Sequence, residues 1–126
     1  MIFFSAVVSP SVFASLNSKG SSRFLRTIFP RMFLFGFVIS LIAFILTILS
    51  NDLFNSIVLV IIGLSFLINR NYLTPLINNF RDQELEGDSK AAKSFKMMHL
   101  LSVLLFIINF FLLILVILLN YINYNL

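Results

Sequence analysis

The sequence contains no cysteine and no tryptophan, only one histidine, and few charges, which make up 11% of its 126 residues. Without cysteine there is no disulfide, thiolate nucleophile or cysteine-ligated metal, and a single histidine excludes multi-histidine sites within one chain. A soluble domain of this size carries about a quarter charged residues. The composition therefore argues against soluble globular, disordered and nucleic-acid-binding proteins. We expect no catalytic residue set, no bound metal and no cofactor.

Hydrophobic residues fill much of the chain instead. They account for 60% of it, sixteen residues are phenylalanine, and the mean hydropathy is +1.03. Three apolar runs, at residues 32–49, 53–73 and 97–119, approach or exceed the roughly 20 residues that a helix needs to cross a membrane. Lipid offers no hydrogen-bond partner to backbone groups, so helices are expected rather than open strands. The sequence predicts an all-α integral membrane helical bundle.

The bundle is predicted to be a single transmembrane domain over residues 1–126 with four membrane helices. Only Ser50, Asn51 and Asp52 separate the first two long runs, so these runs should form a tight antiparallel hairpin. We expect helices at about residues 1–16, 30–49, 53–73 and 89–119, and cytoplasmic loops at about residues 17–29 and 74–96.

The first sixteen residues are apolar but short for a full crossing, and Pro10 removes one backbone donor. Residues 13–15 (Phe-Ala-Ser) resemble a signal-peptide cleavage site. A signal peptide also requires a positively charged N-terminal region, however, and no lysine or arginine precedes Lys19. We expect a membrane helix that is short or truncated at its N-terminal end. A cleaved signal peptide and an interfacial segment are the alternatives.

Basic residues are distributed in a way that predicts orientation. All nine fall into two clusters, one before the first long run and one between the second and third: Lys19, Arg23, Arg26 and Arg31, then Arg70, Arg81, Lys90, Lys93 and Lys96. Because positive charge is retained in the cytoplasm, both clusters are predicted to be cytoplasmic, with the C-terminus outside the inner membrane. The expected lipid-headgroup anchors are Arg23, Arg26, Arg31, Tyr72, Tyr121 and Tyr124.

The two basic segments should contain some local structure. Residues 20–31 read as a short helix capped by Ser21 or Ser22, which Pro30 bends into the membrane span. Residues 81–96 read as a flexible solvated loop, in which Asp88 or Ser89 caps the last helix.

A polar stripe is predicted on the last helix. His99, Ser102 and Asn109 are spaced by three and seven residues, which places them within roughly 80° of one another at about 100° per residue. One interpretation is a hydrated half-path opening inward, with His99 at its mouth. The other is interhelical hydrogen bonding. The two preceding spans offer five partners: Ser40, Thr47, Asn55, Ser65 and Asn69.

Three segments carry a resemblance to a known family: residues 28–31 (IFPR), 73–82 (LTPLINNFRD) and 93–105 (KSFKMMHLLSVLL). In order and composition they resemble the transmembrane protein 205-like domain family, whose bacterial members are labelled a domain of unknown function. The resemblance implies a four-helix integral membrane protein and a link to drug resistance, without a catalytic set. It singles out a cytoplasmic motif of Pro75, Arg81, Asp82, Lys93 and Lys96, together with His99 and Ser102.

Three functions remain open at this point. The leading hypothesis is a non-enzymatic transport, permeability, resistance or assembly component that associates with the lipid bilayer and forms a homo-oligomer or joins a membrane-protein partner. The second is a haem- or metal-binding membrane redox protein, which with one histidine per chain needs either a symmetric dimer or another axial ligand in addition to His99. The third is a structural subunit of a larger membrane complex.

Overall fold

The computed structural model describes residues 3–125, which are almost wholly helical and include no strand. In chain order the elements are η1 (Phe4–Val8), α1 (Ser9–Ser15), α2 (Ser18–Leu49), α3 (Leu53–Ile68), η2 (Asn69–Leu73), α4 (Thr74–Leu85) and α5 (Ser89–Asn125), where η marks a π-helix.

Three of the helical segments are long and apolar enough to cross a membrane: Ser18–Leu49, Leu53–Leu85 and Ser89–Asn123. The apolar helix before them, Ala6–Ser15, is shorter. These features confirm the predicted fold class, an all-α membrane bundle of four helices whose first helix is short. Met1 and Ile2, where the first helix was expected to begin, lie outside the described residues.

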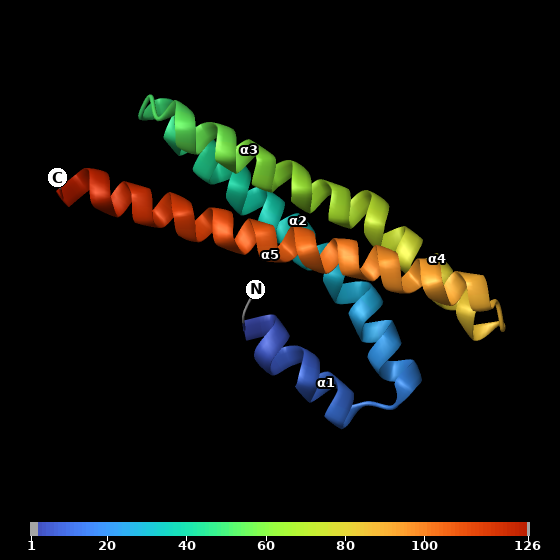
Figure 1. Ribbon diagram of the computed structural model, residues 1–126. Helices are drawn as coiled ribbons and strands as arrows, with labels where there is room; N and C mark the ends of the chain where they lie inside the picture. The colour runs from blue at the N-terminus through green and yellow to red at the C-terminus, as the bar shows by residue number, and fades with distance from the viewer. Residues whose placement is uncertain (1–2, 126) are drawn as a thin grey trace.

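The helices run back and forth, so that the connections gather at two ends (Figure 1). The turn between α2 and α3 lies at the same end as the C-terminus. The turn between α4 and α5 lies at the opposite end, and α1 joins α2 through a short connection to form a V. α3, η2 and α4 follow one another as one continuous helical segment.

Both π-helices stand directly before a Ser/Thr-Pro pair. The Ser9 N–H donates to the Phe4 carbonyl and the Thr74 N–H donates to the Asn69 carbonyl, each five residues back. The next residue is Pro10 in one case and Pro75 in the other. Proline has no N–H and its ring crowds the carbonyl four residues earlier, so a wider turn before it relieves the clash. The helices therefore continue through both prolines.

The segment at residues 17–29, expected to be a cytoplasmic loop, is helical from Ser18 onward. The short helix predicted at residues 20–31 is confirmed as helix, but it begins two residues earlier and is continuous with the membrane span. Asn17 caps the helix, because its Oδ1 accepts the Gly20 N–H at 2.8 Å. Ser21, one of the predicted caps, bonds through Oγ to the Leu16 carbonyl at 3.2 Å. The helix also packs on the N-terminal segment, since the Phe29 ring meets the Phe4 ring edge-on at 5.3 Å. Tertiary packing thus keeps this polar segment helical.

The expected loop at residues 74–96 is also mostly helical. α4 extends to Leu85, a turn at residues 86–88 follows, and α5 begins at Ser89. Gly87 has φ +103°, a backbone conformation that residues other than glycine rarely adopt. Asp88 Oδ1 accepts the N–H groups of Lys90 and Ala91 at 2.8 and 3.3 Å, so Asp88 caps α5. Contacts of α4 with α2 and α5, described below, hold this segment helical.

The apolar core lies between α2 and α3. Phe33, Val58, Ile62 and Phe66 are buried and form one cluster, to which phenylalanines and aliphatic side chains of α2 and α5 add partly buried contacts. The close approach of the two helices depends on Gly36, whose missing side chain leaves room for the Phe66 ring. The core therefore fixes the hairpin that carries the polar side chains described next.

Candidate functional site

Three pairs of polar side chains connect the α3–η2 segment to α5. We call them the polar seam, which consists of Asn69–Ser102, Ser65–Asn109 and Asn55–Asn120. Their hydrogen bonds measure 2.5, 3.1 and 3.0 Å in that order. The pairs follow one another from the α4 end of the bundle toward the C-terminal end, so the seam runs along most of the α3–α5 contact.

The α5 members of the seam share one face of the helix. Ser102, Asn109 and Asn120 are separated by seven and eleven residues, which places neighbours within about 20° of each other at about 100° per residue. His99 lies about 60° from Ser102 on the same scale. In the structure His99 is exposed, and its ring stacks on that of Phe95 at 5.9 Å. The predicted stripe is therefore divided, and Asn120 joins Ser102 and Asn109 in place of His99.

Asn69 connects the seam to the π-helix. Its side chain is only 1% exposed. Its Oδ1 accepts from Ser102, its Nδ2 donates to the Ser65 carbonyl at 3.3 Å, and its backbone carbonyl accepts from Thr74 Oγ1 at 2.7 Å. Thr74 can reach that carbonyl because the π-turn widens the backbone before Pro75. Interhelical hydrogen bonds of this kind contribute about 0.6 kcal/mol each. They are suited to fixing helix register.

A further interhelical pair joins α2 to α3 near the C-terminal end. Ser56 Oγ donates to Thr47 Oγ1 at 2.9 Å. Ser40, the other α2 residue considered as a partner, instead donates to the Gly36 carbonyl within its own helix at 2.5 Å.

At the opposite end the two basic segments meet. Arg26 on α2 donates from both terminal nitrogens to the Asp82 carboxylate on α4, at 2.9 and 2.5 Å. Arg81 donates to Glu84 at 2.6 Å and also lies over the Phe95 ring, 5.4 Å from its centroid. A bidentate arginine–carboxylate pair fixes both distance and orientation. The motif residues Arg81 and Asp82 therefore tie α4 to its neighbours, and the two basic clusters lie at one end of the bundle.

The remaining predicted positions are at the surface. Pro75 occupies the first turn of α4, and its side chain is exposed. Tyr72 and Tyr121 are 67% and 68% exposed. The side chain of Tyr124 lies outside the described part of the chain. Four of the predicted basic residues that have not been described above are also exposed: Arg23, Arg31, Lys93 and Lys96.

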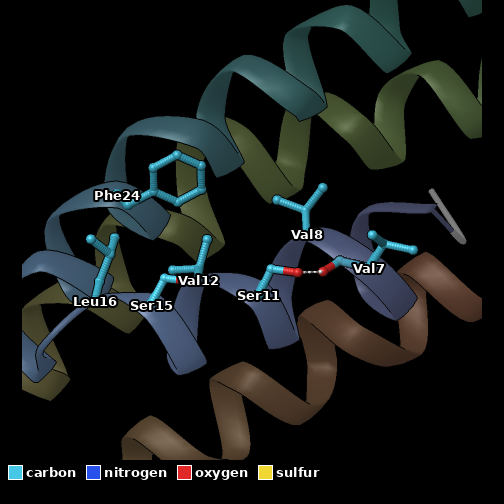
Figure 2. Close-up of a pocket in the computed structure, with 7 residues that line it drawn as sticks. All are labelled: Val7, Val8, Ser11, Val12, Ser15, Leu16 and Phe24. Atoms are coloured by element: carbon cyan, nitrogen blue, oxygen red, sulfur yellow. Dashed lines mark hydrogen bonds between the residues drawn. The ribbon is translucent and has the colours of Figure 1, made fainter.

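An apolar groove opens between the N-terminal segment and α2 (Figure 2). Its volume is about 360 Å³, and its walls are formed by Val7, Val8, Ser11, Val12, Ser15, Leu16 and Phe24. Ser11 Oγ donates to the Val7 carbonyl at 2.7 Å, so this hydroxyl is satisfied within its own helix. Ser11 and Ser15, two small residues four positions apart, both line the groove and are exposed.

Sequence reasoning missed two features of this arrangement. Asn120 lies just beyond the predicted last helix (residues 89–119), although its spacing from Asn109 is about three helical turns and could have identified it. The Arg26–Asp82 pair joins residues 56 positions apart, and no local pattern indicates it. Within residues 3–125, no group of three or more histidines, cysteines or acidic residues is placed to hold a metal ion.

Comparison with known proteins places the chain in a family. A model described as "Domain of unknown function (DUF4149)" matches residues 1–86, from the N-terminal segment to the end of α4. The match leaves out α5, which carries His99, Ser102 and Asn109. No curated protein and no solved structure matches the chain. Because the matched segment covers more than half of the sequence, the chain belongs to the DUF4149 family.

Proposed function

We propose that this chain is a non-enzymatic assembly component of the inner membrane, and that it associates with a second copy of itself through the groove beside the short first helix. The observation that carries the proposal is the open groove lined by Ser11 and Ser15. Small residues four apart let membrane helices approach closely. Ser11 and Ser15 are exposed on the groove side of α1, where α2 leaves them uncovered among the described residues.

The polar seam supports an assembly role over a solute path inside one protomer. Its side chains bond to each other, so their hydrogen-bonding capacity is largely used in holding α3 against α5. A transport or permeability function would then need a path between protomers. Self-association through the groove would serve both an assembly role and a transport path between protomers.

Engineered cysteines test this association cleanly, because the chain has no cysteine of its own. Two copies in one membrane that pair around a two-fold axis bring equivalent residues to the same depth. Ser15→Cys is therefore expected to give a disulfide-linked dimer when isolated membranes are oxidised with copper phenanthroline, detected on a non-reducing gel. Ala14→Cys is the matched control, since Ala14 is exposed on the same helix but does not line the groove.

Native mass spectrometry in mild detergent complements the cross-linking. A dimer mass together with a Ser15-specific cross-link supports the proposal. A monomer mass without a cross-link refutes it, and equal cross-linking of both variants would show that α1 does not associate through this face. A larger mass with no self-cross-link would assign the groove to a different protein and overturn self-association.

We further propose that both basic clusters face the cytoplasm and that the C-terminus lies outside. The Arg26–Asp82 pair and the Asn55–Asn120 pair support this topology, because they bring together the segments that the positive-inside rule assigns to each side. In intact cells, Asn51→Cys is expected to react with a membrane-impermeant maleimide, whereas Lys90→Cys should react only after permeabilisation. Labelling of Lys90→Cys in intact cells would show that the topology is the reverse of the one proposed.

Kinship with the transmembrane protein 205-like domain family is also proposed. The support is the run of motif residues from Lys93 to Ser102 on α5, which continues beyond the segment matched by the DUF4149 model.

A further inference from the structure

The end of the bundle remote from the basic clusters carries one charged side chain, Asp52. No lysine or arginine occurs between Arg31 and Arg70, or after Lys96. The ion pairs among residues 3–125 are Arg26–Asp82 and Arg81–Glu84, both at the other end. Asp52 is only partly exposed, at the start of α3. This carboxylate therefore has no counter-ion within the described part of the protein.

Beside it lies a buried oxygen atom without a hydrogen-bond donor. Asn55 is 4% exposed, and its Nδ2 donates both to Asp52 Oδ2 and to Asn120 Oδ1. Both amide N–H groups are thereby used, while Asn55 Oδ1 is buried and has no partner. Buried polar atoms are almost always satisfied by protein, water or an ion, so we expect a water molecule or an ion at this atom.

The oxygens around Asn55 come from two segments of the chain. Asp52 and Asn55 belong to the start of α3, and Asn120 belongs to α5. One N–H of a primary amide points to the same side as its oxygen, so one of the two accepting oxygens lies beside Asn55 Oδ1. Carboxylate and amide oxygens are the ligands that hard cations prefer. Nearby backbone carbonyls at the end of α2 are already occupied by the N–H groups of residues 50–52.

We propose that Asp52, Asn55 and Asn120 form a binding site for a small monovalent cation, for which Na⁺ is the probe. A single carboxylate supplies one negative charge, which one monovalent cation neutralises. The ion satisfies Asn55 Oδ1 and joins α3 to α5 at the outer end of the polar seam. This site is independent of the groove on which the proposed self-association depends.

Equilibrium binding of ²²Na⁺ to the purified full-length protein in detergent tests the proposal, with N-methyl-D-glucamine chloride keeping the ionic strength constant. Wild type should bind saturably. Asp52→Asn is expected to weaken binding roughly tenfold or more, because it removes the charge that sets cation affinity. Asparagine caps helices as well as aspartate does, so this variant keeps the cap of α3.

Asp88→Asn is the matched control, because it makes the same change at another helix cap at the opposite end of the protein. Its Na⁺ affinity should stay within about twofold of wild type, as expected for a distant, independent site. The unfolding temperature in N-methyl-D-glucamine chloride reports whether Asp52→Asn folds normally. Absence of saturable binding in wild type would show that only water occupies the site. Unchanged binding by folded Asp52→Asn would also overturn the proposal.

Discussion

Replacing Ile62 by alanine is expected to lower the free energy of unfolding by about 2–5 kcal/mol, the range for truncation of a large aliphatic side chain in a packed core. Ile62 is 1% exposed and lies in the cluster with Phe33 and Phe66. Two aromatic neighbours collapse poorly into the space of the missing atoms, so a cavity should remain. Reversible unfolding in mixed micelles of mild detergent and dodecyl sulfate measures the loss.

Ile61→Ala is the control, because it removes the same atoms from the next residue of α3. Ile61 is 52% exposed and lies on the outside of the protomer. Its truncation should change stability by less than about 0.5 kcal/mol, as is usual for surface positions. Equal losses for the two variants would show that the α2–α3 core does not form as described, or that Ile61 is buried against a second protein.

Gly36→Ala is expected to have a similarly large effect for the opposite reason, because it adds atoms where none fit. A β-carbon at Gly36 would lie 2.8–2.9 Å from three carbons of the Phe66 ring. The ring is 5% exposed and is tilted against Phe33 at 6.4 Å, so it has little room to move. Overpacking of this kind costs about 1–3 kcal/mol, or more when the helices must separate. The unfolding experiment above measures it.

Gly63 supplies a matched control on the facing helix. A β-carbon at Gly63 would meet Phe37 and Ser40 at 3.6–3.8 Å, which is ordinary van der Waals contact. Alanine is also the better helix former, by about 1 kcal/mol. Gly63→Ala should therefore be neutral or stabilising. A loss for Gly63→Ala as large as that for Gly36→Ala would contradict the described helix–helix distance.

Hydropathy predicted the membrane helices well because bilayer thickness imposes their length directly on the chain. The hairpin at residues 50–52 was equally predictable, since three polar residues between two long apolar runs leave room only for a tight turn. Asn51 adopts φ +58° there, and Asp52 caps α3 by accepting the Asn55 N–H at 3.1 Å. Both residue types are favoured at such positions by local chemistry.

The polar segments were harder to predict because their conformation depends on distant partners. Residues 20–31 were predicted as a short helix, but the sequence did not indicate that this helix is continuous with the membrane span, an arrangement that the Phe4–Phe29 and Arg26–Asp82 contacts support. The seam was partly predictable, because five of its six residues were identified from the sequence, but not how they pair. These five are Asn55, Ser65, Asn69, Ser102 and Asn109. His99 was assigned to the same stripe because residue spacing gives only the angle of each side chain around the helix axis. Which of these side chains is covered depends on where α3 packs against α5.

The π-turn at residues 69–73 has a geometric consequence for everything that follows it. One additional residue in a helical turn rotates the downstream helix by about 100° around its axis. Without that rotation, the side chains of α4 would be turned by about 100° relative to α3. Asp82 would then no longer face Arg26. The Thr74–Pro75 pair, which the π-turn precedes, thereby helps to set the direction in which α4 presents Asp82.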